Sequence, residues 1–147
     1  MSEKLRQFST FEISGKWYGI DVTKVQEIVK PMQMTPIPMA PKFICGLTNL
    51  RGQVAMAIGI RELFGLSPTN ASEAMSIVCR INGHLISLLV DAIDDVVELP
   101  ESLKTSVPST LGGDIKRFVG SIYKVPKRIL CVIDVEIVGN FLNSKAA

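Results

Sequence analysis

The chain has 147 residues, a formal net charge of +2, and a composition of 47% hydrophobic and 20% charged residues. These proportions exclude a disordered chain and are typical of one globular domain with its own hydrophobic core. Acidic and basic residues are mixed along the sequence without a basic stripe between aromatic residues, which argues against a nucleic-acid-binding protein.

The first residues carry charges but no apolar stretch follows them, so we expect no signal peptide. No apolar run in the sequence reaches the roughly 20 residues of a membrane-spanning helix. The sequence therefore predicts a cytoplasmic protein without direct membrane insertion.

Apolar residues that alternate with a period of two dominate the chain and predict a mainly β fold. The pairs Ser14-Gly15 and Asn82-Gly83 predict tight turns, the second being the strongest short signal for a β-hairpin. Strands are expected at residues 8–13, 17–21, 53–60, 76–82, 84–90, 95–99, 118–124 and 128–133. In the strand at 53–60 every second residue is large and apolar, which predicts one fully buried face.

A few short helices are expected between the strands. The first covers residues 22–29 and has Asp21 or Thr23 as its N-cap. The second covers residues 61–64, and the last, a C-terminal helix, covers residues 135–142.

Capping and loop signals complete the pattern. Asp134 is the expected cap of the C-terminal helix, which Gly139 weakens by about 1 kcal/mol. The proline-rich stretch 35–41 cannot donate a full set of ladder hydrogen bonds and predicts an edge or an irregular segment. Loops are expected at residues 67–74 and 106–113.

A weak internal similarity links the two halves of the chain. Apolar residues of 43–60 recur seventy-five positions later in 118–135, and Ile20-Asp21 resembles Val90-Asp91. Chance matches between apolar strands and a genuine duplication both remain open. A duplication predicts two small barrels joined near residues 67–75.

The sequence contains no convincing reaction centre, and we expect no catalytic residues, metal site or cofactor. His84 is the only histidine and directly follows a predicted turn. The acidic residues between Asp91 and Glu98 lack the spacing of a calcium loop, and no glycine motif for phosphate binding occurs. The three cysteines lack CxxC spacing, which predicts reduced core residues. They are Cys45, Cys79 and Cys131. We therefore expect a binding module.

The stretch Asn49-Leu50-Arg51-Gly52 places an arginine between two apolar runs, at an expected turn between strands. We expect Arg51 to be partly buried, and a buried charge requires a partner. Glu27 on the first short helix is the predicted partner, in a bidentate clamp that ties this helix to the turn. The clamp is structural or shapes a partner-binding face, and the two roles are compatible.

Several stretches together resemble the CheW-like family of chemotaxis coupling proteins over residues 8–142. They are YGIDVTKVQEI at 18–28, IPMAPKFICGLTNLRG at 37–52, LVDAIDDV at 89–96, FVG at 118–120 and the strand at 128–135. The order and spacing of KVQEI, NLRG and VD carry the resemblance.

The resemblance implies one domain over residues 8–147, built as two packed five-stranded β-barrels with a few short helices and a divide near residues 67–75. It also implies a non-enzymatic adaptor that links the cytoplasmic tips of chemoreceptors to the regulatory domain of the histidine kinase CheA. The adaptor would lie in receptor arrays at the inner face of the membrane, and self-association in array rings is a further expectation.

The resemblance also assigns partner-binding residues. Those that match the receptor-facing groove of the family are Val25, Glu27, Ile28, Asn49, Leu50 and Arg51. Gly46, Val90 and Asp91 match further motif positions, for which a structural role stays open.

The chain departs from the family pattern in the strand after NLRG. Met56 replaces a usual proline and Gly59 replaces a usual aspartate. Alternatives therefore stay in view: a CheW-like barrel in a divergent array or motility pathway with other partners, the regulatory domain of a kinase or a scaffold fused to a phospho-acceptor domain, or a small-ligand-binding β-barrel.

Overall fold

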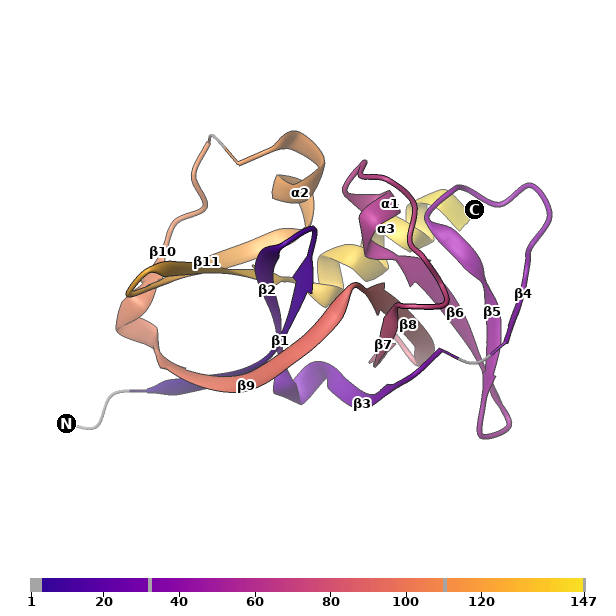
Figure 1. Cartoon of the computed structure of the whole chain (residues 1–147), viewed down its shortest axis with the longest axis horizontal. Coiled ribbons are helices and arrows are strands. Elements are labelled where there is room, and N and C mark those ends of the chain that lie inside the picture. Colours follow the sequence, from indigo (N-terminus) through magenta and orange to yellow (C-terminus); the bar gives the residue numbers. More distant parts are fainter. Residues whose placement is uncertain (1–3, 32, 110, 147) are drawn as a thin grey trace.

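The computed structural model describes residues 4–31, 33–109 and 111–146, with side chains through residue 144. Within these ranges, two six-stranded sheets, which we call sheet A and sheet B, lie side by side along the long axis of the molecule (Figure 1). The prediction of a mainly β fold with a few short helices is confirmed. The sheets are open, with unpaired outer edges, and are not the closed five-stranded barrels that we expected.

Both sheets are antiparallel except for one parallel contact in the middle of each. Sheet A has the order β10(Lys104–Thr105), β11(Val119–Val125), β12(Arg128–Ile133), β2(Lys16–Asp21), β1(Leu5–Ile13), β9(Ala92–Pro100). Sheet B has the order β3(Val25–Val29), β7(Met75–Ile81), β8(His84–Val90), β6(Gln53–Gly59), β5(Ile44–Leu50), β4(Met34–Thr35). The parallel contacts join β12 to β2 and β6 to β8.

The helices of the described chain are short. They are η1(Val22–Lys24), α1(Ile60–Leu63), η2(Glu101–Leu103), α2(Gly113–Phe118) and α3(Val135–Ala146). The predictions of α1 and α3 are confirmed, and Asp134 caps α3 through its Oδ1, which accepts from the N–H of Glu136 at 2.9 Å. Helix α2 was not predicted; its first residue, Gly113, was expected in a loop and its last, Phe118, in a strand, and both of these expectations are wrong.

The predicted helix over 22–29 is also wrong. Only the three residues of η1 are helical, capped by Asp21, and the chain then continues as strand β3. A register shift between Val25 and Glu27 interrupts the pairing of β3 with β7, so that Val25 opposes Cys79 and Ile28 opposes Ile77. Because the β-bulge adds one residue, apolar residues three positions apart face the same core, as they would on a helix.

Three of the hairpins, β1–β2, β5–β6 and β7–β8, have two-residue turns with both residues in the left-handed region. The predicted turn at Ser14-Gly15 has φ values of 53° and 78°, and that at Asn82-Gly83 has 51° and 80°. The third is Arg51-Gly52, with φ values of 53° and 85°, between β5 and β6. This backbone twist matches the twist of the strands that such turns join.

The two halves of the chain have the same order of elements. The hairpin β5–β6 is followed by α1 as β11–β12 is followed by α3, and the N–H groups of Gly59 and Asp134 donate to the carbonyls of Phe43 and Phe118, each at 2.9 Å. Strands β1 and β2 of the first half lie in sheet A with β9 to β12, and β7 and β8 of the second half lie in sheet B with β3 to β6. Each sheet therefore contains strands from both halves.

The predicted divide near residues 67–75 lies between these two halves but does not separate the sheets. This segment connects α1 to β7, and the strands on either side of it, β6 and β7, both belong to sheet B. The two sheets are therefore joined because each half of the chain contributes strands to both, and not by a linker between two separate domains.

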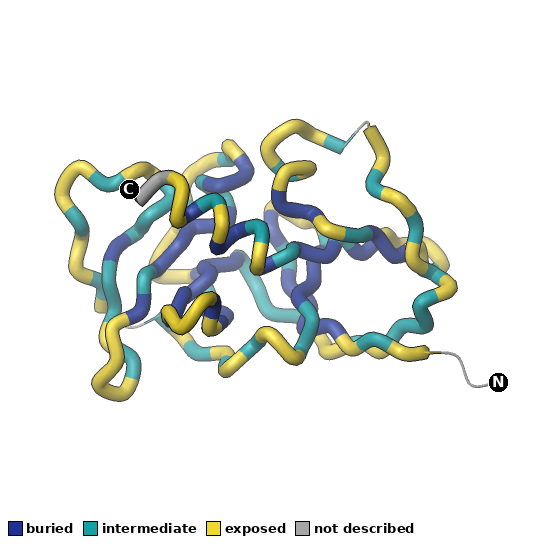
Figure 2. Tube along the Cα trace, turned by 180° about the vertical axis from the view of Figure 1, so that it is seen from behind, coloured by how far each residue is buried: buried dark blue, intermediate teal, exposed yellow. Residues whose placement is uncertain are grey.

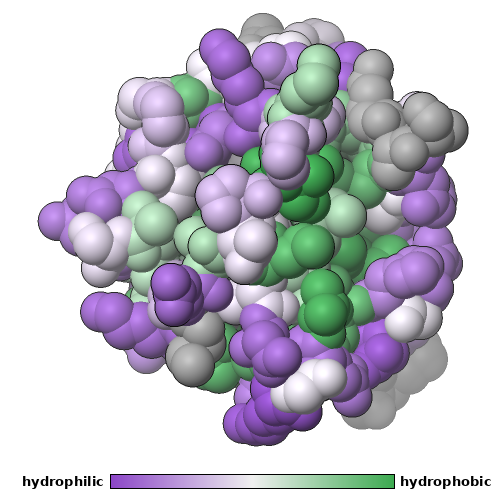
Figure 3. All heavy atoms as spheres, turned by 90° about the vertical axis from the view of Figure 1, so that its right-hand side faces the viewer, coloured by the Kyte–Doolittle hydropathy of each residue, from purple (hydrophilic) through white to green (hydrophobic). Residues whose placement is uncertain are grey.

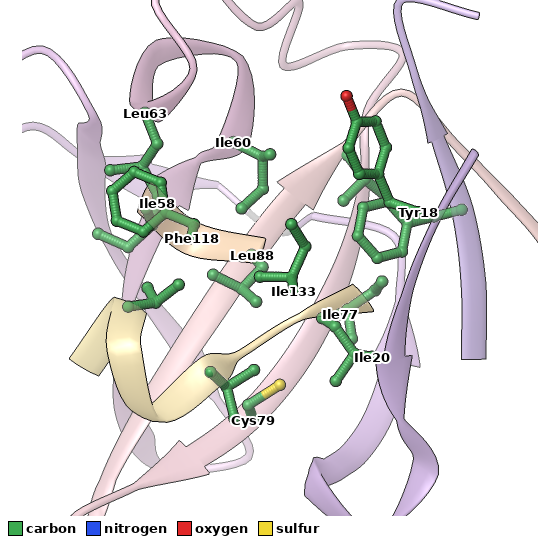
Figure 4. Close-up of a cluster of buried hydrophobic side chains, with 14 of the residues drawn as sticks. Tyr18, Ile20, Ile58, Ile60, Leu63, Ile77, Cys79, Leu88, Phe118 and Ile133 are labelled. Atoms are coloured by element: carbon green, nitrogen blue, oxygen red, sulfur yellow. The ribbon is translucent and has the colours of Figure 1, made fainter. Parts of the chain in front are cut away.

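Buried residues concentrate where the two sheets meet (Figure 2). Figure 4 shows side chains from both sheets and from α1 in one cluster, including Ile20 of sheet A and Leu88 of sheet B. Cys79 lies in this core, and burial raises the pKa of its thiol to about 12. Cys45 and Cys131 are half-buried, so the prediction of a core position is confirmed for Cys79 alone.

Candidate functional site

The predicted pair of Glu27 and Arg51 forms at one end of sheet B. The Nη2 atom of Arg51 lies 2.8 Å from Oε2 of Glu27, which confirms the predicted partner. The expected burial of the arginine is wrong, because its side chain is 78% exposed while that of Glu27 is 16% exposed. Arg51 lies at the tip of a left-handed turn, which directs its side chain outward. We call this pair the clamp.

The clamp differs from the prediction in two further ways. Glu27 lies on strand β3 and not on a helix, so the clamp joins an edge strand to the β5–β6 turn. One nitrogen of the guanidinium contacts the carboxylate, rather than the two of a bidentate pair. An ion pair this exposed contributes about 0.2–1 kcal/mol to stability.

The other predicted residues of the turn hold its shape. The Oδ1 atom of Asn49 accepts a hydrogen bond from the N–H of Gly52 at 2.8 Å. Leu50 packs against a small buried cluster that contains Ala55 and Val78. The turn is thus anchored on both sides of Arg51, which is the residue it presents to solvent.

On β3, Val25 opposes Cys79 and Ile28 opposes Ile77, two residues of the main core. Val25 is half-buried against this core, and Ile28 remains 38% exposed. The structure therefore brings Val25, Glu27, Ile28 and the turn together at the same part of sheet B.

Gly46, Val90 and Asp91 lie apart from the clamp. At Gly46, which has a φ of 147°, a Cβ atom would stand 2.7 Å from the carbonyl oxygen of Thr35, so the glycine allows β4 to cross closely. Val90 is completely buried in the core. These positions support the fold rather than the exposed surface.

Asp91 joins helix α1 to the first hairpin. Its two carboxylate oxygens accept hydrogen bonds from Nε and Nη2 of Arg61, each at 2.7 Å, and Oδ2 also accepts from the N–H of Ser14 at 2.8 Å. The hydrogen bonds from Arg61 hold the pKa of Asp91 below its ordinary value.

An apolar groove that the sequence did not predict begins at Gln53, directly after the turn that carries Arg51. It has a volume of about 500 Å³ and lies between strands β5, β6, β7 and β8 and helix α3. Its apolar lining consists of Leu47, Val54, Met56, Ile81, Leu85, Ile86 and Leu142. We call it the α3 groove. On this side of the molecule, hydrophobic residues reach the surface inside a hydrophilic rim (Figure 3).

Strand β6 contained a signal for this groove. Its large apolar residues were all expected to be buried, and Ile58 is buried as predicted. Met56 is only half-buried and Val54 is 64% exposed. The apolar stripe of the strand is therefore longer than the core, and its surplus forms the floor of the groove.

Helix α3 forms one wall of the groove by approaching sheet B closely. At Gly139 a Cβ atom would stand 2.4 Å from Cγ2 of Ile81, so no larger residue fits there without movement. Gly139 thus lowers the helix propensity of α3 but permits the close contact of this helix with β7.

The space enclosed by the curved sheet B is too small for a ligand. It amounts to about 10 Å³, lined by small side chains such as Ala55, Ala57 and Ser87, which is room for about one water molecule. Among the described residues, no group of three or more His, Cys, Asp or Glu side chains could hold a metal ion. In the same part of the chain, none of the helices has both the length and the apolar character needed to cross a membrane.

Known proteins resemble this chain over nearly its whole length. The CheW-like domain matches residues 7–140. "Chemotaxis protein CheW" of Bacillus subtilis (strain 168) is 31% identical over 138 residues, covering 93% of this chain and 88% of the relative. "Probable chemotaxis protein CheW" of Rhizobium etli is 27% identical over 144 residues, covering 97% and 92%.

Among solved structures, the scaffolding protein TtCheW from Thermoanaerobacter tengcongensis superposes with a TM-score of 0.83 at 28% identity. The superposition covers 93% of this chain and 89% of that chain. The residues matched by the family domain thus include most of both sheets, the clamp and most of the groove lining. The protein belongs to the CheW-like domain family.

Proposed function

We propose that the protein is a non-enzymatic coupling protein that links the cytoplasmic tips of chemoreceptors to the histidine kinase CheA. Its place in the CheW-like family makes it a chemotaxis scaffold. The observation that carries this conclusion is the family match over residues 7–140. The superposition on a protein described as a scaffold supports it. A coupling protein of this kind acts in receptor arrays at the inner face of the membrane.

The receptor-facing surface in this proposal consists of the α3 groove and the clamp. A helix lays its apolar side chains, spaced by three or four residues, into such a groove. Arg51 projects from the turn that precedes Gln53 of the groove lining, and Asn49 and Leu50 fix this turn. Ile28 adds an exposed apolar side chain on the strand that carries Glu27. Gly46, Val90 and Asp91 have structural roles.

Coupling also requires that the protein respond to the state of the receptor. A scaffold that bound both receptor states equally would transmit nothing to the kinase. The receptor state must therefore change the affinity or the geometry of at least one contact at this surface or at the kinase.

Met56, one of the two residues that depart from the family pattern, lies on the proposed receptor-facing surface. It stands where the family usually has a proline, and it lines the α3 groove. The second candidate for the partner is therefore a receptor of a divergent array or motility pathway, whose side chains fit Met56.

The test is a binding assay between the full chain, a chemoreceptor cytoplasmic fragment and CheA. Met56→Asp places a charge in the groove and should abolish detectable receptor binding. Ile129→Asp, at a 51% exposed apolar position on sheet A, is the matched control and should keep it. Normal receptor binding by a folded Met56→Asp protein would remove the groove from the proposal, and absence of CheA and receptor binding by the unmodified chain would refute the coupling role.

A further inference from the structure

Arg80 of strand β7 lies at one end of the α3 groove, and its guanidinium contacts only neutral groups. It donates to Oε1 of Gln53 at 3.0 Å, to the carbonyl oxygen of Gly83 at 3.2 Å and to Oε1 of Gln26 at 3.4 Å. These hydrogen bonds hold the arginine between β3 and the two turns at this end of sheet B. The residue itself is exposed.

Four of the five other arginines of the described chain have carboxylate partners. The pairs are Arg6 with Asp21 and Glu101, Arg51 with Glu27, Arg61 with Asp91, and Arg128 with Asp94. Arg117 lies over the ring of Phe141. Within the described residues, no carboxylate forms an ion pair with Arg80, so its charge is not balanced locally.

The lining of the α3 groove supplies no negative charge that would balance Arg80. It contains Arg80 and His84 but no aspartate or glutamate. The rest of the lining is apolar or carries an uncharged polar group. The groove therefore offers an apolar floor with an unbalanced positive charge at one end, which is complementary to an apolar partner that carries a negative charge.

The strands of the floor indicate the conformation of the occupant. β5, β6 and β8 each have a neighbouring strand on both sides in sheet B. They present side chains to the groove and have no free edge for an added strand. An occupant must satisfy its own backbone hydrogen bonds, as a helix does.

We propose that the α3 groove binds an amphipathic helix whose carboxylate pairs with Arg80, one or two turns from the apolar side chains that fill the floor. This inference rests on the proposed function and specifies the chemistry of the receptor helix. Hydrogen bonds between a guanidinium and a carboxylate are about twice as strong as those between neutral groups. A carboxylate therefore binds Arg80 more strongly than the present amide and carbonyl acceptors do. Arg80 is already held in place by these acceptors, which lowers the entropic cost of the contact.

The experiment measures the affinity of the full chain for a chemoreceptor cytoplasmic fragment by calorimetry at several NaCl concentrations. Arg80→Gln should weaken binding about tenfold and make it less sensitive to salt, because a charge contact is lost. Arg80→Lys keeps the charge without the planar fork and should give an intermediate affinity. Arg128→Gln, on sheet A, is the matched control and should leave the affinity unchanged.

A charge exchange identifies the partner residue. Arg80→Glu should bind more weakly than Arg80→Gln, and one Glu→Lys or Asp→Lys substitution on the receptor helix should restore its binding. Thermal unfolding of each variant checks that the fold is intact. The same affinity and salt dependence for folded Arg80→Gln and the unmodified chain would overturn the inference.

The outcomes separate this inference from the proposed function. If Met56→Asp abolishes receptor binding while Arg80→Gln does not change it, the groove remains the receptor site and the carboxylate contact is refuted. If neither variant changes receptor binding, the groove is not the receptor site and both proposals for it fail.

Discussion

Arg51 illustrates how the environment of one residue decides its role. The sequence placed it between apolar runs, which suggested burial, yet the left-handed turn carries its side chain into solvent. Glu27 is the less exposed member of the pair. The clamp therefore contributes little to stability and is available to a partner.

Replacement of Arg51 tests this division between stability and binding. Arg51→Ala should lower the free energy of unfolding by no more than about 1 kcal/mol, because the ion pair is exposed. The same variant should weaken binding of the receptor fragment measurably. Chemical denaturation and calorimetry give the two quantities, and a large loss of stability with unchanged binding would contradict the proposed role.

Asp91 predicts a pH dependence of stability with a definite sign. The hydrogen bonds from Arg61 lower the pKa of its carboxyl in the folded chain. The resulting stabilisation is complete above the ordinary pKa of about 3.9 and is lost as the pH falls through the lower pKa of the folded state.

The variant Asp91→Asn measures this contribution. It should be less stable than the unmodified chain by about 2 kcal/mol at pH 7, since hydrogen bonds to a charged group are removed. The difference should shrink as the pH falls below about 3.9. Denaturation curves from pH 7 to pH 2.5 provide the test, and a difference independent of pH would show that the ionised form of Asp91 is not responsible.

At the scale of elements, helix α1 begins without a hydrogen bond from a capping side chain. Gly59 lies at its N-cap and offers no side chain, whereas Asp134 caps the equivalent helix α3. The carboxylate of Glu62 fills the vacant space, accepting from Oγ1 of Thr69 at 2.6 Å. A Cβ atom at Gly59 would stand 2.1 Å from Oε1 of Glu62.

A double-mutant cycle tests whether the side chain of Glu62 occupies the space that a side chain at position 59 would need. Gly59→Asp alone should destabilise the protein by about 1–3 kcal/mol, because the new side chain overlaps Glu62. In the Glu62→Ala background the same change should be neutral or stabilising, because the aspartate can then cap α1. Additive effects in denaturant unfolding would show that the two side chains do not compete.

At the scale of the whole molecule, strand exchange makes the two halves of the chain dependent on each other. Sheet A takes β1 and β2 from the first half and β9 to β12 from the second, while sheet B takes β7 and β8 from the second half and its other strands from the first. We therefore propose that residues 8–147 fold as one cooperative domain.

Division of the chain in the loop at 67–74 tests this dependence. Fragments 1–70 and 71–147 should each lack a stable fold alone, since each would leave central strands unpaired and core surface exposed. Mixing them should restore the circular dichroism spectrum and receptor binding of the intact chain. Independent, cooperative unfolding of either fragment would contradict the proposal.

The sequence by itself determined most of the strands, the turns at Ser14-Gly15 and Asn82-Gly83, the helices α1 and α3, the pair of Glu27 with Arg51, and the family. These features depend on residues close in sequence or on motifs of fixed spacing. Residues 22–29 show the limit of such patterns, because the bulge in β3 gives a strand the apolar spacing of a helix.

Only the tertiary structure decided which strands share a sheet, how far Arg51 is exposed, and where the α3 groove lies. The pairing of β6 with β8 and of β12 with β2 joins segments far apart in the chain and leaves no local mark in the sequence. The groove arises where α3, held close to β7 by the absence of a side chain at Gly139, stops short of covering the apolar stripe of β6. The surface that we propose for receptor binding is thus a consequence of packing between distant elements.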